Sequence, residues 1–149
     1  MNPFHIAVIT AGVTQPSSTR LLADRLTEAT ARALARHDMG EVVVEVVDVR
    51  DVAHDLTNNV LTGFASPDLQ VRLDAIAEAD AVVVATPVYA ASYSGLFKML
   101  IDVLPKDTLR DMPVLLGATG GTARHSLAID HALRPLFAHL GALVAPVAV

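Results

Sequence analysis

Hydrophobic and polar residues along the chain form two alternating patterns. Short runs rich in β-branched residues predict strands, and the longer stretches between them carry apolar residues at the spacing of amphipathic helices. The predicted strands cover residues 4–10, 42–49, 81–85, 113–117 and 143–149. The run at 81–85, AVVVA, has no polar face, which is typical of a parallel strand covered on both sides.

Predicted helices separate these strands. Ser66, Pro67 and Asp68 form a helix start, because they provide a capping hydroxyl, a proline in the first turn and an acid beside the helix dipole. Pro135 predicts a kink in the last helix, and Gly141 predicts its end. The predicted helices cover residues 19–37, 66–79, 95–104 and 129–140, and the segment 50–63 stays ambiguous.

Strands that alternate with helices predict one α/β domain, an open, doubly wound parallel sheet with helices on both faces. The 149 residues suffice for a single domain, which we expect to span 1–149. The last predicted strand is apolar, and no predicted helix follows to cover it. We therefore expect that the domain lacks a C-terminal segment after this strand, or that a second subunit covers the sheet. Ligands of such sheets bind at the carboxyl ends of the strands.

Composition and charge restrict the classes of partner. Sixteen acidic and 11 basic residues give a net charge of −5, which disfavours nucleic acid and anionic membrane surfaces. Hydrophobic residues make up 52% of the chain and the mean hydropathy is +0.46, but polar residues interrupt each apolar run before it could span a membrane. The chain has no cysteine, its histidines lack metal-site spacing, and its N-terminus has no secretory pattern. We expect a cytoplasmic protein without a bound metal.

The loop at 11–18 places hydroxyl residues directly before a predicted helix. Ser17, Ser18 and Thr19 lie where the free amide groups and dipole of that helix favour an anion, which makes this loop a candidate phosphate site. The alternative is that Ser18 only caps the helix. Gly12 is the one glycine here, so the dinucleotide fingerprint G-x-G-x-x-G and the P-loop G-x-x-x-x-G-K-[ST] are both absent. The sequence therefore disfavours a Rossmann-bound NAD and ATP.

The loop at 86–95 holds both tyrosines of a chain that has no tryptophan. Tyr89 and Tyr93 offer flat apolar faces with a polar edge, which suit a planar heterocycle, and Ser92 and Ser94 offer hydrogen bonds. The alternative is that both rings only cover the loop backbone. This loop is a candidate site for an aromatic ring.

The loop at 118–125 follows the next predicted strand. Its adjacent Gly120 and Gly121 allow the backbone to approach a ligand without an intervening side chain. His125 is a candidate pocket residue, with a solvated or capping role as the alternative. We expect the edge of a flat ring to rest on this loop.

Three motifs in these loops and beyond resemble those of the NAD(P)H-dependent FMN reductases, a flavodoxin-like family, and especially reductases that supply reduced flavin to two-component, luciferase-like monooxygenases. The motifs are PVYAASYSGLFKMLID at 87–102, ATGG at 118–121 and LRPLF at 133–137. They follow one another in the family's order, and the resemblance covers nearly the whole chain. It implies a flavodoxin-like, five-stranded parallel sheet with strand order 2-1-3-4-5, FMN as cofactor and NADPH or NADH as co-substrate.

The resemblance also implies roles for the loop residues. Gln15 stands where many relatives carry an arginine near the phosphate or NADPH, so the preference between NADPH and NADH stays open, with Arg20 and Arg124 as alternative basic residues. The implied FMN-binding residues are Ser17, Ser18 and Thr19 at the phosphate, Pro87, Val88, Tyr89, Ser92, Tyr93 and Ser94 around the isoalloxazine, and Thr119, Gly120 and Gly121 at its pyrimidine edge.

The expected reaction is hydride transfer from the nicotinamide to FMN, for which no catalytic side chain is required. Reduced FMN would leave for a partner monooxygenase or pass electrons to a quinone or azo compound. A flavodoxin-type electron carrier is the rival from another class, although a net charge of −5 is only modestly acidic. A receiver domain would need acidic residues where Thr10 and Thr86 stand, and a low-molecular-weight phosphatase would need a cysteine. The resemblance implies a homodimer or homotetramer, with 96–104 as a candidate contact.

Overall fold

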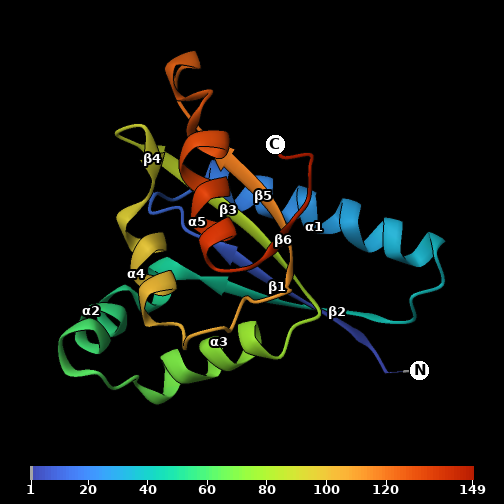
Figure 1. Cartoon of the computed structure of the whole chain (residues 1–149), viewed down its shortest axis with the longest axis horizontal. Coiled ribbons are helices and arrows are strands. Elements are labelled where there is room, and N and C mark those ends of the chain that lie inside the picture. Colours follow the sequence, from blue (N-terminus) through green and yellow to red (C-terminus); the bar gives the residue numbers. More distant parts are fainter. Residues whose placement is uncertain (1) are drawn as a thin grey trace.

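The computed structural model describes residues 2–149 (Figure 1). Its strands are β1 (Phe4–Thr10), β2 (Val42–Asp48), β3 (Ala81–Tyr89), β4 (Ser92–Tyr93), β5 (Pro113–Thr119) and β6 (Leu143–Val144). Its α-helices are α1 (Ser18–Arg36), α2 (Ala53–Thr62), α3 (Pro67–Ala77), α4 (Gly95–Val103) and α5 (Arg134–His139). The 3₁₀ turns η1 (Val49–Val52) and η2 (Ala123–His125) and the π-helix η3 (Ile129–Leu133) complete the described elements.

The parallel sheet has the strand order β2-β1-β3-β5-β6, and β4 pairs with β3 outside this path. Its registers place Ile9 opposite Val47 and Val84, in the most buried part of the sheet. The predicted α/β, flavodoxin-like parallel sheet is confirmed. The structure has six strands in the order 2-1-3-5-6 with β4 aside, where we expected five in the order 2-1-3-4-5, so the exact count and numbering need correction because of the short antiparallel β4. β4 has only two residues, which are too few to show a strand pattern in the sequence.

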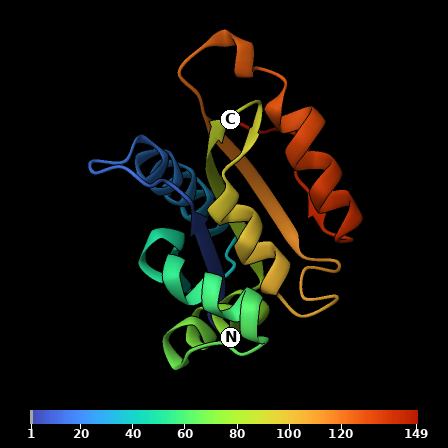
Figure 2. The same ribbon diagram turned by 90° about the vertical axis from the view of Figure 1, so that its left-hand side faces the viewer.

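Helices cover both faces of the sheet, as Figures 1 and 2 show, with α1 on one side and α4 and α5 on the other. Side chains alternate along β1, so Ile6 and Val8 pack under α1 while Ala7 and Ile9 face the opposite layer. Phe97 of α4 and Phe137 of α5 meet in that second layer, with ring centroids 6.2 Å apart. The two core layers thus hold α1 on one face of the sheet and α4 on the other.

Local sequence explains most element boundaries. Ser66 caps α3 as predicted, because its Oγ accepts a hydrogen bond from the Leu69 amide at 3.1 Å. At the predicted kink, the π-helix η3 gives way to α5, whose first turn contains Pro135. The ambiguous segment 50–63 forms most of η1 and all of α2, which ends at the left-handed Gly63. Among residues 2–149, no helix has both the length and the apolar content that a membrane crossing needs.

The last predicted strand is shorter than expected. β6 ends at Val144, whereas a strand was predicted over 143–149. Pro146 has no amide proton to donate to the sheet, so the regular ladder stops just before it. β6 nevertheless forms the edge of the sheet beside β5.

Candidate functional site

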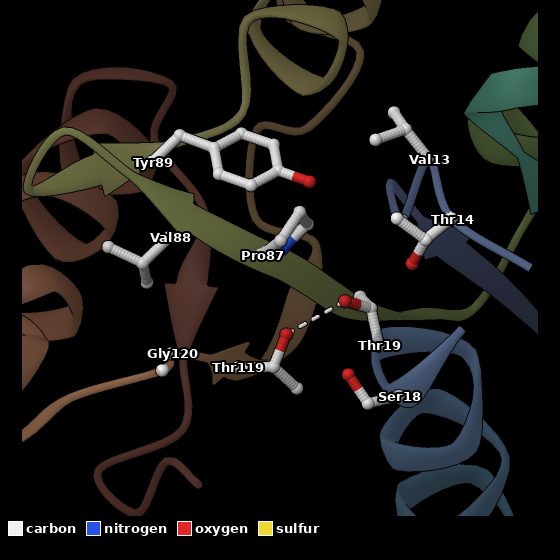
Figure 3. A pocket seen from close by; sticks show the side chains of 11 residues that line it. Val13, Thr14, Ser18, Thr19, Pro87, Val88, Tyr89, Thr119 and Gly120 are labelled. Carbon is white, nitrogen blue, oxygen red and sulfur yellow. Dashed lines mark hydrogen bonds between the residues drawn. The ribbon is translucent and has the colours of Figure 1, made fainter. Parts of the chain in front are cut away.

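A cavity of about 270 Å³ opens at the carboxyl ends of β1, β3 and β5 (Figure 3). Three loops that are far apart in sequence meet there: the first loop at 11–18, the second at 86–95 and the third at 118–125. This is the position expected for ligands of this sheet type. The residues that line it are Gly12, Val13, Thr14, Ser18, Thr19, Pro87, Val88, Tyr89, Thr119, Gly120 and Gly121. The structure therefore brings part of each predicted loop into one site.

The N-terminus of α1 forms one end of the cavity. Ser17 is the N-cap, and its Oγ accepts a hydrogen bond from the Arg20 amide at 3.1 Å. Capping therefore falls to Ser17 and not to Ser18, which lines the cavity together with Thr19. The amides of the first helical residues have no intrahelical partner, and α1 carries no acidic residue in its first turn. This helix end favours an anion and is not neutralised by a carboxylate of its own.

Gly12 shapes the first loop, although the sequence analysis did not include it among the site residues. A Cβ at this position would lie 2.2 Å from Ser17 Oγ and 3.1 Å from Thr19 Cβ, so a larger residue would displace the capping hydroxyl. Val13 and Thr14 also line the cavity and were missed. The signal that could have identified them was the single glycine between a strand and a capped helix.

Two hydroxyl groups join the first and third loops across the cavity floor. Thr19 Oγ1 and Thr119 Oγ1 lie 2.7 Å apart and share a hydrogen bond, which Figure 3 shows as a dashed line. Thr19 is buried, at 2% exposure, although it begins a surface helix. This contact fixes the spacing between the start of α1 and the end of β5.

The second loop is a tight hairpin. β3 continues through Pro87 and Val88 to Tyr89, and the chain turns at Ala90 and Ala91, whose φ angles are +49° and +68°. β4 then returns antiparallel to β3. Tyr89 lines the cavity and is 47% exposed, so its ring forms an open wall.

The remaining predicted residues of this loop do not line that cavity. Tyr93 packs edge-on against Phe97 of α4, with centroids 5.7 Å apart. Ser94 is buried and caps α4, because its Oγ accepts a hydrogen bond from the Phe97 amide at 3.1 Å. Ser92 pairs with Tyr89 in the hairpin. Ser92, Tyr93 and Ser94 thus build the hairpin that presents Tyr89.

Thr86 holds the base of this hairpin, a role the sequence analysis did not find. Its buried hydroxyl donates to the Pro87 carbonyl at 2.9 Å and accepts from the Ser94 amide at 3.1 Å. A threonine at the end of an otherwise apolar strand was the available signal, because a buried hydroxyl needs a partner.

The third loop brings its backbone to the cavity, as predicted from its glycines. Thr119, Gly120 and Gly121 line the cavity, and a Cβ built on Gly121 meets nothing within 4 Å. A Cβ on Gly120 would lie 3.0 Å from His125, whose ring packs behind this glycine. His125 therefore faces a neighbouring hollow of about 280 Å³, and its buried Nδ1 has no hydrogen-bond partner.

The charged residues near the first loop lie outside the cavity. Gln15 and Arg20 line a separate hollow with Asp24 and Asp48, and Arg20 Nε is 3.0 Å from Asp24 Oδ1. Burial raises the pKa of the Asp48 carboxyl above its ordinary value, and the nearby Asp51 adds to this effect, against the opposing hydrogen bond from the Arg50 amide. Within the described part of the chain, the cavity is lined by uncharged residues, and no group of three or more acidic or histidine side chains could hold a metal ion.

Comparison with known proteins gives a consistent assignment. Residues 4–149 match the family model of NADPH-dependent FMN reductases. An FMN reductase (NADPH) of Pseudomonas aeruginosa is 38% identical over 148 residues, which cover 99% of this chain and 76% of that protein. The NADH-dependent FMN reductase SfnF of Pseudomonas putida is 41% identical over 141 residues, which cover 95% of this chain and 73% of that protein.

Solved structures agree with these matches. An oxidoreductase from Corynebacterium diphtheriae superposes with a TM-score of 0.95 at 41% identity, over 100% of this chain and 81% of that chain. The apo form of the NADH:FMN oxidoreductase EmoB gives a TM-score of 0.81 at 33% identity, over 97% of this chain and 73% of that one. The chain therefore belongs to the NADPH-dependent FMN reductase family, and as a member it is an FMN-using oxidoreductase with NADPH or NADH as the reductant.

Proposed function

We propose that FMN binds in the cavity at the carboxyl ends of β1, β3 and β5, and that the nicotinamide nucleotide reduces it there. One observation supports this most strongly: an anion-favouring helix end and an exposed aromatic wall line the same cavity. FMN combines a phosphate with a flat ring system, so it matches both features. The separation of these features across three loops explains why no single motif defines the site.

The residues present fit FMN. At the phosphate end, the amides of Ser18 and Thr19 and their hydroxyl groups supply neutral donors. At the ring end, Tyr89 supplies a flat face, and Gly121 leaves open space where a Cβ would otherwise stand. Gly12 adds a close backbone approach beside the helix start.

The protein's own contribution is to bind FMN and the nicotinamide nucleotide and to orient them towards each other. Bound FMN supplies the hydride-accepting ring for the nicotinamide, as flavin chemistry requires. Tyr89 is the one titratable side chain in the described cavity lining, and hydride transfer needs no proton from it. The open side of the Tyr89 wall leaves room for a second planar molecule.

Several predicted contacts remain proposals at the level of individual residues. Ser17, Ser94 and Tyr93 make contacts that shape the loops, and their effect on FMN would be indirect. Gln15 and His125 lie in hollows next to the cavity, and a ligand that extends beyond it would reach them.

We further propose that reduced FMN passes to a partner monooxygenase in the cytoplasm. A quinone or azo compound as the acceptor is the alternative reaction, and a flavodoxin-type carrier is the alternative protein class. The uncharged lining supports an exchangeable flavin, because neutral donors alone hold the phosphate. We also propose that the protein forms a homodimer or homotetramer, with a subunit contact over 96–104.

Steady-state oxidation of NADPH and NADH in the presence of free FMN tests this function. A reductase turns over many equivalents of FMN per protein, and the rate saturates with FMN concentration. Flavin that binds tightly but is reduced by neither nucleotide would instead identify a carrier. Addition of a quinone or an azo dye under argon then separates direct acceptor reduction from flavin release.

A further inference from the structure

The LRPLF motif at 133–137 contributes no residue to the cavity, yet its arginine makes contacts far along the chain. Arg134 Nη1 donates to the Ala145 carbonyl at 2.9 Å, and Nη2 donates to the Pro146 carbonyl at 2.8 Å. Arg134 Nε also pairs with Asp130 one turn earlier, at 2.9 Å. The side chain of Arg134 is only 27% exposed. One guanidinium thus ties the last helix to the C-terminal segment.

These two carbonyls belong to a bulge beside β5. The Ala145 amide donates to the Val114 carbonyl at 2.8 Å, and the next bond to β5 runs from the Val149 amide to the Leu116 carbonyl at 3.2 Å. β5 advances two residues between these bonds, whereas the C-terminal segment advances four. The extra residues include Pro146, which has no amide proton, so the bulged carbonyls turn to Arg134.

The bulge ends next to the candidate site. The Val149 carbonyl accepts a hydrogen bond from the Ala118 amide at 2.8 Å, directly before Thr119 and Gly120 of the cavity. In Figure 1 the C-terminal segment runs beside β5, in the same direction, towards this end of the sheet. A shift of the bulge would change which residue meets the Ala118 amide.

We infer that Arg134 is a positioning residue for the third loop of the flavin site: by holding the carbonyls of the bulge, it sets the bond between Val149 and Ala118. A planar guanidinium can serve two carbonyls and a carboxylate at once, whereas a lysine ammonium lacks this fork. This role makes Arg134 part of the framework of the site, although no residue at 133–137 lines the cavity. Its consequence for ligand binding rests on the proposed function, but its consequence for the backbone does not.

The chain offers a closely matched control. Arg72 of α3 also pairs with an aspartate one turn earlier, Asp68, at 3.1 Å, and its side chain is 26% exposed. The hydrogen bonds of Arg72 go to Asp68 within α3, whereas those of Arg134 reach the bulge. Comparison of Arg134→Met with Arg72→Met therefore separates the long-range contact from the loss of a helical ion pair.

Amide exchange of Ala118, followed by NMR, and flavin binding, followed by fluorescence quenching, test the inference. In Arg134→Met we expect Ala118 to exchange about tenfold faster or more, as for the loss of charge-assisted bonds. The affinities for FMN and for riboflavin should both fall, by similar factors of about five, because we place the third loop at the ring and not at the phosphate. Arg134→Lys should fall between wild type and Arg134→Met, and Arg72→Met should change neither measurement.

Unchanged Ala118 exchange in folded Arg134→Met would overturn the inference, and so would a loss of FMN affinity without a loss of riboflavin affinity. Where Arg134→Met does not fold, Arg134→Lys decides by the same two measurements. If the wild-type protein binds no flavin, the proposed function fails, while the exchange of Ala118 still decides the positioning role.

Discussion

The hydroxyl pair of Thr19 and Thr119 makes a testable claim about single residues. Replacement of Thr119 by valine keeps the shape but leaves the buried Thr19 hydroxyl without its partner. We expect the free energy of unfolding to fall by about 1–3 kcal/mol, as for other unsatisfied buried groups. Thr119→Ser should retain most of the stability. The double variant Thr19→Val/Thr119→Val should lose less than the sum of the single losses in urea denaturation, and full additivity would contradict the contact.

The two tyrosines are expected to respond differently to substitution. Tyr89→Leu removes the flat wall of the cavity and should weaken FMN binding about two- to tenfold, in line with the usual strength of aromatic contacts. Tyr89→Phe should preserve both binding and turnover. Tyr93→Leu should lower thermal stability with little change in affinity, because its ring contacts Phe97. Loss of turnover in Tyr89→Phe with normal FMN binding would point to a chemical role for the phenol.

At this scale the sequence predicted residue types better than residue roles. The hydroxyl cluster before α1 was predicted, but Ser17 caps the helix while Ser18 faces the cavity. Both tyrosines were expected at the ring, and only Tyr89 lines the cavity. The sequence shows which contacts a tyrosine can make, but not where its ring points. That direction depends on the turn at Ala90 and Ala91, which leaves no periodic signal in the sequence.

The first turn of α1 permits a test in which stability and binding change in opposite directions. Ser18→Asp places a carboxylate beside the positive end of the helix dipole and should stabilise the free protein by about 0.3–1 kcal/mol. The same charge should repel the FMN phosphate and lower the affinity for FMN about tenfold or more, while the affinity for riboflavin changes little. Thermal unfolding and fluorescence quenching measure the two effects, with Ser18→Asn as the neutral control. Equal weakening of both flavins would place the phosphate elsewhere.

The hairpin between β3 and β4 carries strain that a glycine can remove. Ala91 has a φ of +68°, a conformation that costs an alanine about 1–2 kcal/mol. Ala91→Gly should therefore raise the midpoint of urea denaturation. Ala138→Gly, at an exposed position of α5 with ordinary helical geometry, should lower it. If both variants lower the midpoint, strain at the turn is not what limits stability.

Elements marked by helix caps or β-branched runs were predicted from sequence, and elements without these marks were not. β1 and α3 match their expected ranges closely because caps and β-branched runs mark them. α2 buries only Leu56 and has no side-chain cap at its start, so neither a cap nor a long buried face marks it in the sequence. β4 exists because its residues pair with the end of β3, a tertiary contact that two residues cannot encode locally.

At the scale of the molecule, alternation of strands and helices was enough to predict the sheet and the edge at which ligands bind. The crossover rule fixes which loops meet, so residues of the first, second and third loops converge as expected. The bulge at Pro146 was not predictable, because it depends on a guanidinium in another element. Long-range contacts of this kind join elements that the sequence pattern treats as independent.

The assembly state is the last prediction, and it concerns the surface next to α4. The largest exposed apolar side chains near this helix gather where α2 meets α3: Val60 and Val71 are 53% and 64% exposed, and Leu61 and Phe64 are 79% and 80% exposed. The stretch 56–67 has no charged residue, so two copies of a chain with net charge −5 can meet there without repulsion. We expect the proposed contact over 96–104 to extend onto this corner. Light scattering at micromolar concentration should show an oligomer for the wild type and a smaller mass for Leu61→Ser/Phe64→Ser, with Leu127→Ser, another exposed leucine, as the control. A monomeric wild type, or an unchanged mass in the double variant, would remove this corner from the interface.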